Sequence, residues 1–201
     1  MAATSGTIQT ATAGTSNFRA GVNAGDSIAS GGNYNVCVGD EAGTAISTGD
    51  QNTAVGYQAL ATENANSNNT AIGYQALKDQ DGGDGNTAVG SFALQDLTNA
   101  SRSTAVGSYA GFSNLGADDV TFIGHNTGLF ATTAAYSVFV GSKAGQGITG
   151  TKLTGNHNVA IGFSAGLLLQ GTATENVLVG SYAGDAITTG SENVCMGLGA
   201  G

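Results

Sequence analysis

The sequence predicts an all-β parallel β-solenoid, a β-roll of about ten to eleven coils of 17 residues each. Residues 52–60 return almost unchanged 17 residues later, at 69–77. A glycine that follows Val, Ile or Met occurs ten times between Gly39 and Gly197, and its first six intervals are all 17 residues. Small residues keep a constant distance from this glycine. A fixed period of this length is typical of coils that stack along one axis.

We number each copy from position 1, usually Asn, to position 17. Position 5 is the glycine, position 8 is Ala in nine of ten copies, and position 9 is Gly or Leu. This pattern predicts a short strand at positions 1 to 4, a bend at the glycine, a second extended piece and a surface turn. We expect the glycine to allow positive φ or close backbone approach, and stacked Asn side chains to form a ladder. The four extra residues at 151–154 predict a surface loop.

The chain divides into a short first segment and one long repeat domain. Residues 1–16 are rich in Thr, Ala, Ser and Gly without a clear phase, so they are interpreted as an N-terminal tail or docking segment. Residues 17–201 form the β-solenoid repeat domain, whose first coil is degenerate because Arg19 stands at position 3.

Composition excludes several classes of partner. The net charge is −9 and the chain has only five Lys and Arg residues, which argues against nucleic acid and anionic membranes. No run approaches the roughly 18 apolar residues that cross a bilayer, so membrane insertion is not expected. Cys37 and Cys195 are nine coils apart, roughly 40 Å at about 4.8 Å per coil, which excludes an intrachain disulfide.

Both faces of the predicted strands are apolar. Side chains alternate across a strand, so position 3 lies on one face and positions 2 and 4 on the other. We expect position 4 to form the coil core, with Val38, Val55, Ile72, Val89, Val106, Ile123, Val140, Ile161, Val179 and Met196. We expect position 3 to form a subunit interface, with Cys37, Ala54, Ala71, Ala88, Ala105, Phe122, Phe139, Ala160, Leu178 and Cys195. Because soluble monomers seldom expose such a stripe, the sequence predicts association of identical chains. Three coils around a common axis is the preferred arrangement, although the pattern alone does not fix the number.

The repeated Asn-Thr-Ala-Val-Gly-x-x-Ala pattern resembles the head repeats of trimeric autotransporter adhesins, the YadA-like head, which also occur in bacteriophage tail fibres. The resemblance covers residues 17–201. It implies a homotrimeric left-handed β-roll that serves as a stiff stalk or adhesive head outside a cell or on a virion. The 17-residue period is longer than the coil typical of those heads, which predicts a larger turn on one side. No neck or anchor follows Gly201, so we expect a phage fibre rather than an autotransporter.

Reaction chemistry is sparse in this sequence. His125 and His157 have no partner at metal-ligand spacing, and they are interpreted as surface residues. Residues 79–85 hold three aspartates, yet they depart from the calcium-loop pattern, so an acidic solvated turn is favoured over Ca²⁺. Asp118 and Asp119 occupy the same turn two coils later. Asp40 and Glu41 are adjacent carboxylates, which point in opposite directions on an extended strand. We expect no enzyme activity, no catalytic or metal-binding residues and no cofactor.

The functional expectation is a structural or adhesive fibre segment. A bacteriophage tail fibre that contacts a host-cell surface glycan or protein, and other fibre or virion proteins, is favoured. A bacterial surface adhesin head and a self-stacking extracellular filament are the alternatives. An aromatic row at positions 6 and 7 predicts packing at the bend or a sugar-stacking surface: Tyr57, Tyr74, Phe92, Tyr109, Phe163 and Tyr182. A threonine row at position 2 would suit an ice-binding solenoid if it faced water, whereas we expect position 2 inside: Thr53, Thr70, Thr87, Thr104 and Thr121.

Overall fold

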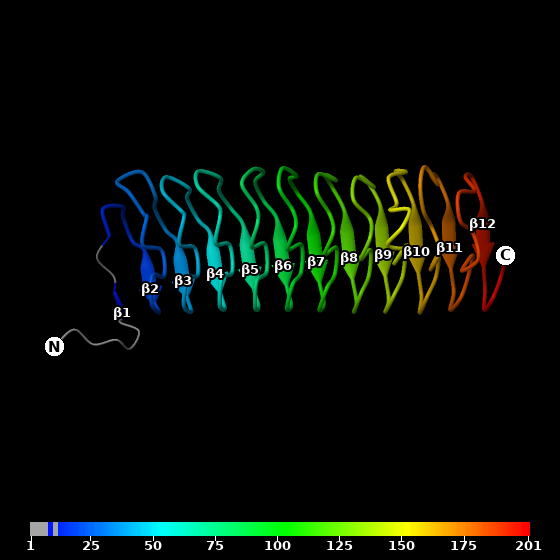
Figure 1. The fold of residues 1–201 in the computed structure, drawn as a ribbon, viewed down its shortest axis with the longest axis horizontal. Helices are drawn as coiled ribbons and strands as arrows, with labels where there is room; N and C mark the ends of the chain where they lie inside the picture. The colour runs from blue at the N-terminus through cyan, green and yellow to red at the C-terminus, as the bar shows by residue number, and fades with distance from the viewer. Residues whose placement is uncertain (1–7, 10–11) are drawn as a thin grey trace.

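The computed structural model describes residues 8–9 and 12–201, and it confirms a parallel β-solenoid of about eleven coils of about 17 residues. The coils stack into a rod with one 12-stranded sheet whose strands follow chain order (Figure 1). All neighbours from β2 to β12 are parallel, and β1 pairs antiparallel with β2. The strands are β1 (Ile8–Gln9), β2 (Phe18–Ala20), β3 (Val36–Val38), β4 (Thr53–Val55), β5 (Thr70–Ile72), β6 (Thr87–Val89), β7 (Thr104–Val106), β8 (Thr121–Ile123), β9 (Val138–Val140), β10 (Val159–Ile161), β11 (Val177–Val179) and β12 (Val194–Met196).

Each coil contains only one strand, so the prediction of a second extended piece is wrong. Positions 5 to 11 form consecutive turns, in which residues at positions 7 and 9 adopt positive φ, such as Gln75 at 54° and Leu77 at 50°. Backbone hydrogen bonds still join these turns from coil to coil: Gln75 N–H donates to the Tyr57 carbonyl at 2.9 Å, and Leu77 N–H donates to the Ala93 carbonyl at 3.0 Å. Left-handed residues turn the chain without ending the ladder that stiffens the rod.

Position 3 faces the interior, which reverses the expected roles of the two strand faces. The side chains assigned to a subunit interface are buried within a single chain, nine of them completely and Cys195 with 9% exposure: Cys37, Ala54, Ala71, Ala88, Ala105, Phe122, Phe139, Ala160, Leu178 and Cys195. Those assigned to the coil core lie half-buried or exposed on the outer face: Val38, Val55, Ile72, Val89, Val106, Ile123, Val140, Ile161, Val179 and Met196. Alternation along a three-residue strand puts only its middle residue inside.

The interior is filled by positions 3 and 9 together. Where position 3 is large, position 9 is glycine: a Cβ on Gly145 would lie 2.5 Å from the Phe139 ring, and one on Gly184 would lie 2.6 Å from Leu178. In three consecutive coils position 3 is alanine, as at Ala71, and position 9 is a fully buried leucine, as at Leu77. Ala105 and Ala160 instead accompany glycines, Gly111 and Gly166, and side chains such as Phe122 and Leu178 from the next coil fill the space beside these glycines. Leu77 keeps a left-handed backbone that costs about 1–2 kcal/mol. The interior therefore accommodates at most one large side chain per coil from this pair.

The glycine at position 5 is required both by its conformation and by close contact between coils. From Gly39 to Gly180 its φ lies between 122° and 140°, a region that side chains disfavour. A Cβ at Gly90 would lie 2.6 Å from the carbonyl carbon of Gly107 in the next coil. The prediction of positive φ and close backbone approach is confirmed. Gly197, in the last coil, has φ of 115° but no atom within 4 Å of such a Cβ.

Buried asparagines at position 1 form the predicted ladder. The Oδ1 atom of Asn52 accepts the Asn69 N–H at 2.9 Å, and the Asn69 Oδ1 accepts the Asn86 N–H at 2.9 Å. The Asn86 Nδ2 donates to the Ala100 carbonyl within its own coil at 2.7 Å. Each buried Asn side chain thus donates a hydrogen bond within its own coil and accepts one from the backbone of the next coil. These bonds matter because an unpaired buried polar group is costly. Val120 interrupts the ladder in the middle of the rod.

A second ladder lies at position 16, where acidic and hydroxyl residues alternate. The Asp84 carboxylate accepts the Ser67 N–H at 2.6 Å, and the Ser101 hydroxyl oxygen accepts the Asp84 N–H at 3.1 Å. The Asp118 carboxylate then accepts the Ser101 N–H at 2.7 Å. Aspartates on consecutive coils would stand roughly 4.8 Å apart and repel each other. Serine in the intervening coil keeps the hydrogen bond and avoids this repulsion.

The insertion at 151–154 is not simply a surface loop. Leu153 is fully buried and makes parallel bridges with Ala131 and Gly171 in the neighbouring coils. Its N–H donates to the Phe130 carbonyl at 3.0 Å. Ile46 and Leu97 at position 12 of their coils are fully buried, whereas Ile148 at the same position is only half-buried, so Leu153 supplies the apolar side chain in its place.

The first coil differs from the others because a charged side chain occupies its interior position. The Arg19 guanidinium lies at the interior position 3, donates to the Ala24 carbonyl and pairs with Asp26 at 3.0 Å. Of the expected N-terminal tail, residues 1–7 and 10–11 lie outside the described residues, and β1 adds to the sheet at Arg19 and Ala20. The tail and docking assignment of residues 1–16 stays a prediction.

Replacing Gly90 with alanine is expected to destabilise the rod strongly. Strain from the positive φ alone costs about 1–3 kcal/mol, and the contact with Gly107 adds to it. Gly197→Ala is the matched control, since it has the strained φ without the contact. Urea unfolding should show a clearly lower midpoint for Gly90→Ala than for Gly197→Ala. Equal midpoints would contradict the close approach of the coils.

A double-mutant cycle tests the shared interior volume. Ala71→Phe alone overpacks the coil, which costs about 1–3 kcal/mol, and Leu77→Gly alone leaves a cavity, as in Leu→Ala losses of about 2–5 kcal/mol. The double variant copies the natural Phe139 and Gly145 pair, so it should be more stable than the sum of the single effects by at least about 1 kcal/mol. Additive losses in denaturant unfolding would contradict this packing.

Glu63 predicts a pH effect on stability. This carboxyl is fully buried at position 12, and desolvation raises its pKa, although hydrogen bonds from Asn66 oppose the shift. The folded state therefore prefers the protonated form of Glu63. The loss of stability from burying the charged carboxylate is absent below the unfolded pKa of about 4.5 and grows as pH rises through the folded pKa. Glu63→Gln should stabilise the protein more at pH 7 than at pH 4. A pH-independent difference between the two unfolding free energies would contradict it.

Candidate functional site

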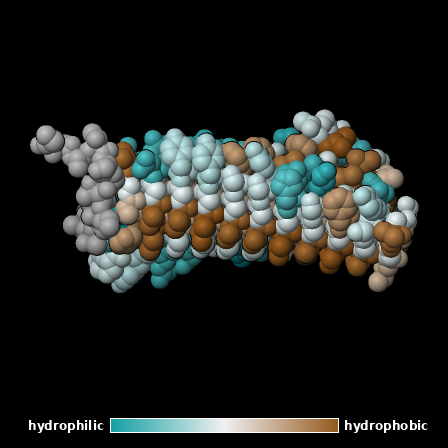
Figure 2. Space-filling model, turned by 90° about the horizontal axis from the view of Figure 1, so that it is seen from below, coloured by the Kyte–Doolittle hydropathy of each residue, from teal (hydrophilic) through white to brown (hydrophobic). Residues whose placement is uncertain are grey.

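The outer face of the sheet is a long uncharged surface. Positions 2 and 4 of β3 to β12 hold only Val, Ile, Thr and Met, and several are well exposed, including Ile72 at 39%, Val106 at 37% and Ile123 at 40%. Figure 2 shows a continuous band of apolar side chains along the rod. Nine coil spacings of about 4.8 Å make this surface on the order of 40 Å long. We call positions 2 and 4 of β3 to β12 the outer sheet face.

The threonine row lies on this outer sheet face, so the expectation that position 2 points inside is wrong. Thr53, Thr70, Thr87, Thr104 and Thr121 are half-buried and pair in register along β4 to β8. Val138 continues the same column in β9. The hydroxyl row therefore stands beside the apolar row of position 4 on a regular surface.

Aromatic side chains form a second continuous feature, on the turns at positions 6 to 10. Tyr57 stacks on Tyr74 with centroids 5.5 Å apart, Tyr74 contacts the Phe92 edge at 5.1 Å, and Phe92 stacks on Tyr109 at 4.7 Å. Phe112 is tilted against Tyr109 at 5.5 Å. The rings pack on one another, yet Tyr57 and Tyr74 remain 42% and 46% exposed. We call these five rings the aromatic ladder.

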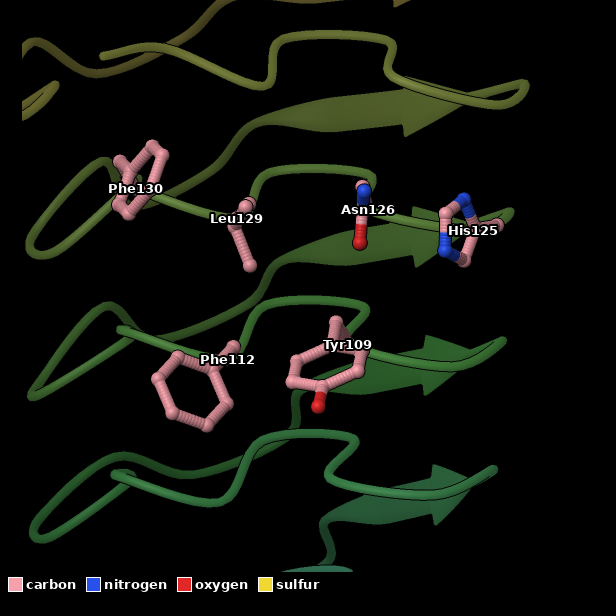
Figure 3. Close-up of a pocket in the computed structure, with 6 residues that line it drawn as sticks. All are labelled: Tyr109, Phe112, His125, Asn126, Leu129 and Phe130. Atoms are coloured by element: carbon pink, nitrogen blue, oxygen red, sulfur yellow. The ribbon is translucent and has the colours of Figure 1, made fainter. Parts of the chain in front are cut away.

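An open hollow begins where the aromatic ladder ends. It has a volume of about 420 Å³ and is lined by six residues of the two coils that contain β7 and β8: Tyr109, Phe112, His125, Asn126, Leu129 and Phe130. Figure 3 shows Tyr109 and Phe112 on one coil and the other four residues on the next, with the Asn126 and Leu129 side chains extending toward the coil of Tyr109. Sequence reasoning singled out only Tyr109 and His125. The change along position 7 from Phe92 and Tyr109 to Asn126 could have pointed to Asn126, but the repeat gives no signal for Phe112, Leu129 or Phe130.

Asp40 and Glu41 lie in the turn after β3, so the expectation that they stand on an extended strand is wrong, and their carboxylates bond to neighbouring coils. The Glu41 Oε2 accepts the Gln58 Nε2–H at 2.6 Å, and the Asp40 Oδ1 accepts the Val22 N–H at 3.0 Å. The Gln58 Oε1 in turn accepts from Gln75 at 2.7 Å. These carboxylates have structural partners in neighbouring coils.

The acidic turns also have structural partners. Asp84 and Asp118 belong to the position 16 ladder. Arg102 pairs with Asp119 at 2.8 Å, and its hydrogen bond lowers the pKa of the Asp119 carboxyl. Within residues 8–9 and 12–201, no three His, Cys, Asp or Glu side chains group to hold a metal ion.

The remaining reactive side chains are separated. His157 stacks on Tyr136 with centroids 5.1 Å apart, while His125 lies at the hollow. Cys37 and Cys195 are free thiols, as the distance along the rod predicts, and burial raises the pKa of Cys37 to about 12. Residues 8–9 and 12–201 contain no apolar helix with the length that a bilayer crossing requires.

The comparisons with known proteins add no relative. The sequence matches no protein-family model, and neither a curated protein nor a solved structure shows significant similarity to it. The candidate sites are therefore defined by the geometry of this chain: the outer sheet face, and the aromatic ladder with its hollow.

Proposed function

We propose that this chain is a segment of a homotrimeric structural and adhesive fibre. The observation that carries the proposal is the outer sheet face, which is uncharged and carries an apolar side chain at position 4 in ten successive strands. An exposed apolar surface of this length marks an interaction site in soluble proteins. Identical chains can cover it by packing their sheets lengthwise, because every coil presents the same side chains at the same spacing.

The proposed interface differs from the one expected at position 3. Exposed positions 2 and 4 take its place, and Ile72, Val106 and Ile123 are central contacts. Three chains would direct their outer sheet faces toward a common axis. The number three comes from the resemblance of the repeats to YadA-like heads, for which the parallel solenoid is a compatible fold.

The stiffness of the rod supports a role as a spacer or shaft. Backbone hydrogen bonds run from coil to coil both in the strands and in the turns. A continuous ladder resists bending, since each coil contacts only its neighbours and all must deform together. We place the fibre outside the cell, on a virion tail, where its turns would contact a host-surface glycan or protein. A bacterial adhesin head would use the same interface.

The threonine row supports a second candidate function, ice binding. Five threonines in register on a regular outer face present hydroxyl and methyl groups at the coil spacing. In a trimer the same row is covered by neighbouring chains, so the two functions compete for one surface. A thermal hysteresis assay separates them, because a fibre segment should show no activity, and activity in a monomer would favour ice binding.

The fibre proposal predicts the mass of the protein in solution. Light scattering should give three times the 19.6 kDa of one chain. Ile72→Lys, Val106→Lys and Ile123→Lys together should reduce the mass to one chain without unfolding it, because these side chains lie on the outside and like charges would face each other across the axis.

A matched variant carries the same added charge away from the outer sheet face. Ala65, Asn99 and Thr133 lie exposed in the turn at position 14, and their replacement by lysine should leave the trimer intact. Circular dichroism spectra of all three proteins should agree. A wild-type protein that has the mass of one chain, or a charged-face variant that stays trimeric, would overturn the proposed interface.

A further inference from the structure

We propose that the hollow at the end of the aromatic ladder binds an uncharged saccharide ring. This inference deepens the adhesive part of the proposed function and rests on it, because it names the class of surface molecule that the fibre would hold. The hollow lies within one chain, on the turns rather than on the outer sheet face. Saccharide binding and self-association can therefore be measured separately.

The hollow lies where the stacked rings of the aromatic ladder stop, at the place that the next ring would occupy. Phe92 covers one face of Tyr109 at 4.7 Å with an interplanar angle of 26°. On the other side, position 7 of the next coil is Asn126, and no further ring of the described residues stacks there. A flat ligand about as thick as one ring can lie on the open face of Tyr109, against Phe112 and below Leu129 (Figure 3).

The polar groups at the hollow favour a saccharide over a purely apolar ring. Asn126, His125 and Tyr109 bring an amide, an imidazole and a hydroxyl group to the hollow. They can donate to and accept from ring hydroxyls. A ligand with apolar C–H faces and a hydroxyl-bearing edge matches an aromatic platform with these groups at its rim.

The charge and the volume of the hollow also favour an uncharged saccharide. None of the six lining residues is an acid, a lysine or an arginine, although the chain as a whole carries a net charge of −9. A carboxylated or phosphorylated ligand would find no fixed cation among the lining residues. The volume of about 420 Å³ lies in the range of about 300–1,000 Å³ typical of small-ligand sites.

The test uses the full chain and neutral hexasaccharides of glucose, galactose, mannose and N-acetylglucosamine, titrated by ligand-observed NMR. At least one should bind with an affinity in the micromolar to millimolar range. Asn126→Phe should weaken that binding at least tenfold, because the new ring fills the missing place in the stack. Aromatic residues already occupy position 7 at positive φ, at Phe92 and Tyr109, so this variant should fold and keep its denaturation midpoint.

Two further variants complete the design. Tyr109→Ala removes the platform and should also weaken binding at least tenfold. Tyr182→Ala is the matched control, since Tyr182 occupies position 7 with 44% exposure outside the hollow, and it should bind like the wild type. N-acetyl-tyrosinamide serves as an aromatic probe. The inference is overturned if no hexasaccharide binds, or if the Asn126→Phe variant binds the hexasaccharide as tightly as the wild type does. It is also overturned if N-acetyl-tyrosinamide binds at the hollow and no hexasaccharide displaces it.

Discussion

Hydrogen bonding between successive coils is the constraint on which the structure depends. It fixes each column of side chains at one spacing, so every position must tolerate a copy of itself directly above and below. Glycine at position 5 satisfies this by having no Cβ to meet the next backbone. Asparagine at position 1 satisfies it by accepting from the following coil. The alternation of Asp84, Ser101 and Asp118 satisfies it by separating like charges.

The sequence was sufficient to predict the solenoid, but it was not sufficient to predict which face of each strand points into the interior. The 17-residue period, the glycine and the asparagine ladder follow from local rules and were confirmed. Both faces of the strand are apolar, so periodicity could not say which one is inside. The missing signal is the volume balance between positions 3 and 9, in which Phe139 accompanies Gly145 and Ala71 accompanies Leu77. Only residues that share one interior need to compensate in this way.

The candidate sites were predictable to different degrees. The aromatic row could be found from the repeat, because Tyr57 and Tyr74 occupy equal positions in successive copies. The hollow could not, since it depends on Phe112 and Phe130, which stand at different positions of their coils. The insertion was also misread, because a single apolar residue, Leu153, turns an apparent surface loop into part of the interior. Irregularities in a repeat carry information that its consensus does not.

The two proposed surfaces use this regularity in opposite ways. Self-association through the outer sheet face relies on identical rows, in which each copy adds the same contact. Saccharide binding relies on the point where a row changes, at Asn126. A fibre built in this manner can extend its shaft by adding coils and can specify a ligand by altering one coil.

The central claim, that position 3 is the interior of a single chain, is tested most directly by the reactivity of Cys37. In a Cys195→Ala background this is the one remaining thiol, and the three outer-face lysine substitutions remove the contribution of any partner chain. Native Cys37 should then react with a maleimide far more slowly than it does in urea, because it is fully buried within the coil. Labelling of the folded monomer at the rate of the unfolded chain would contradict the account.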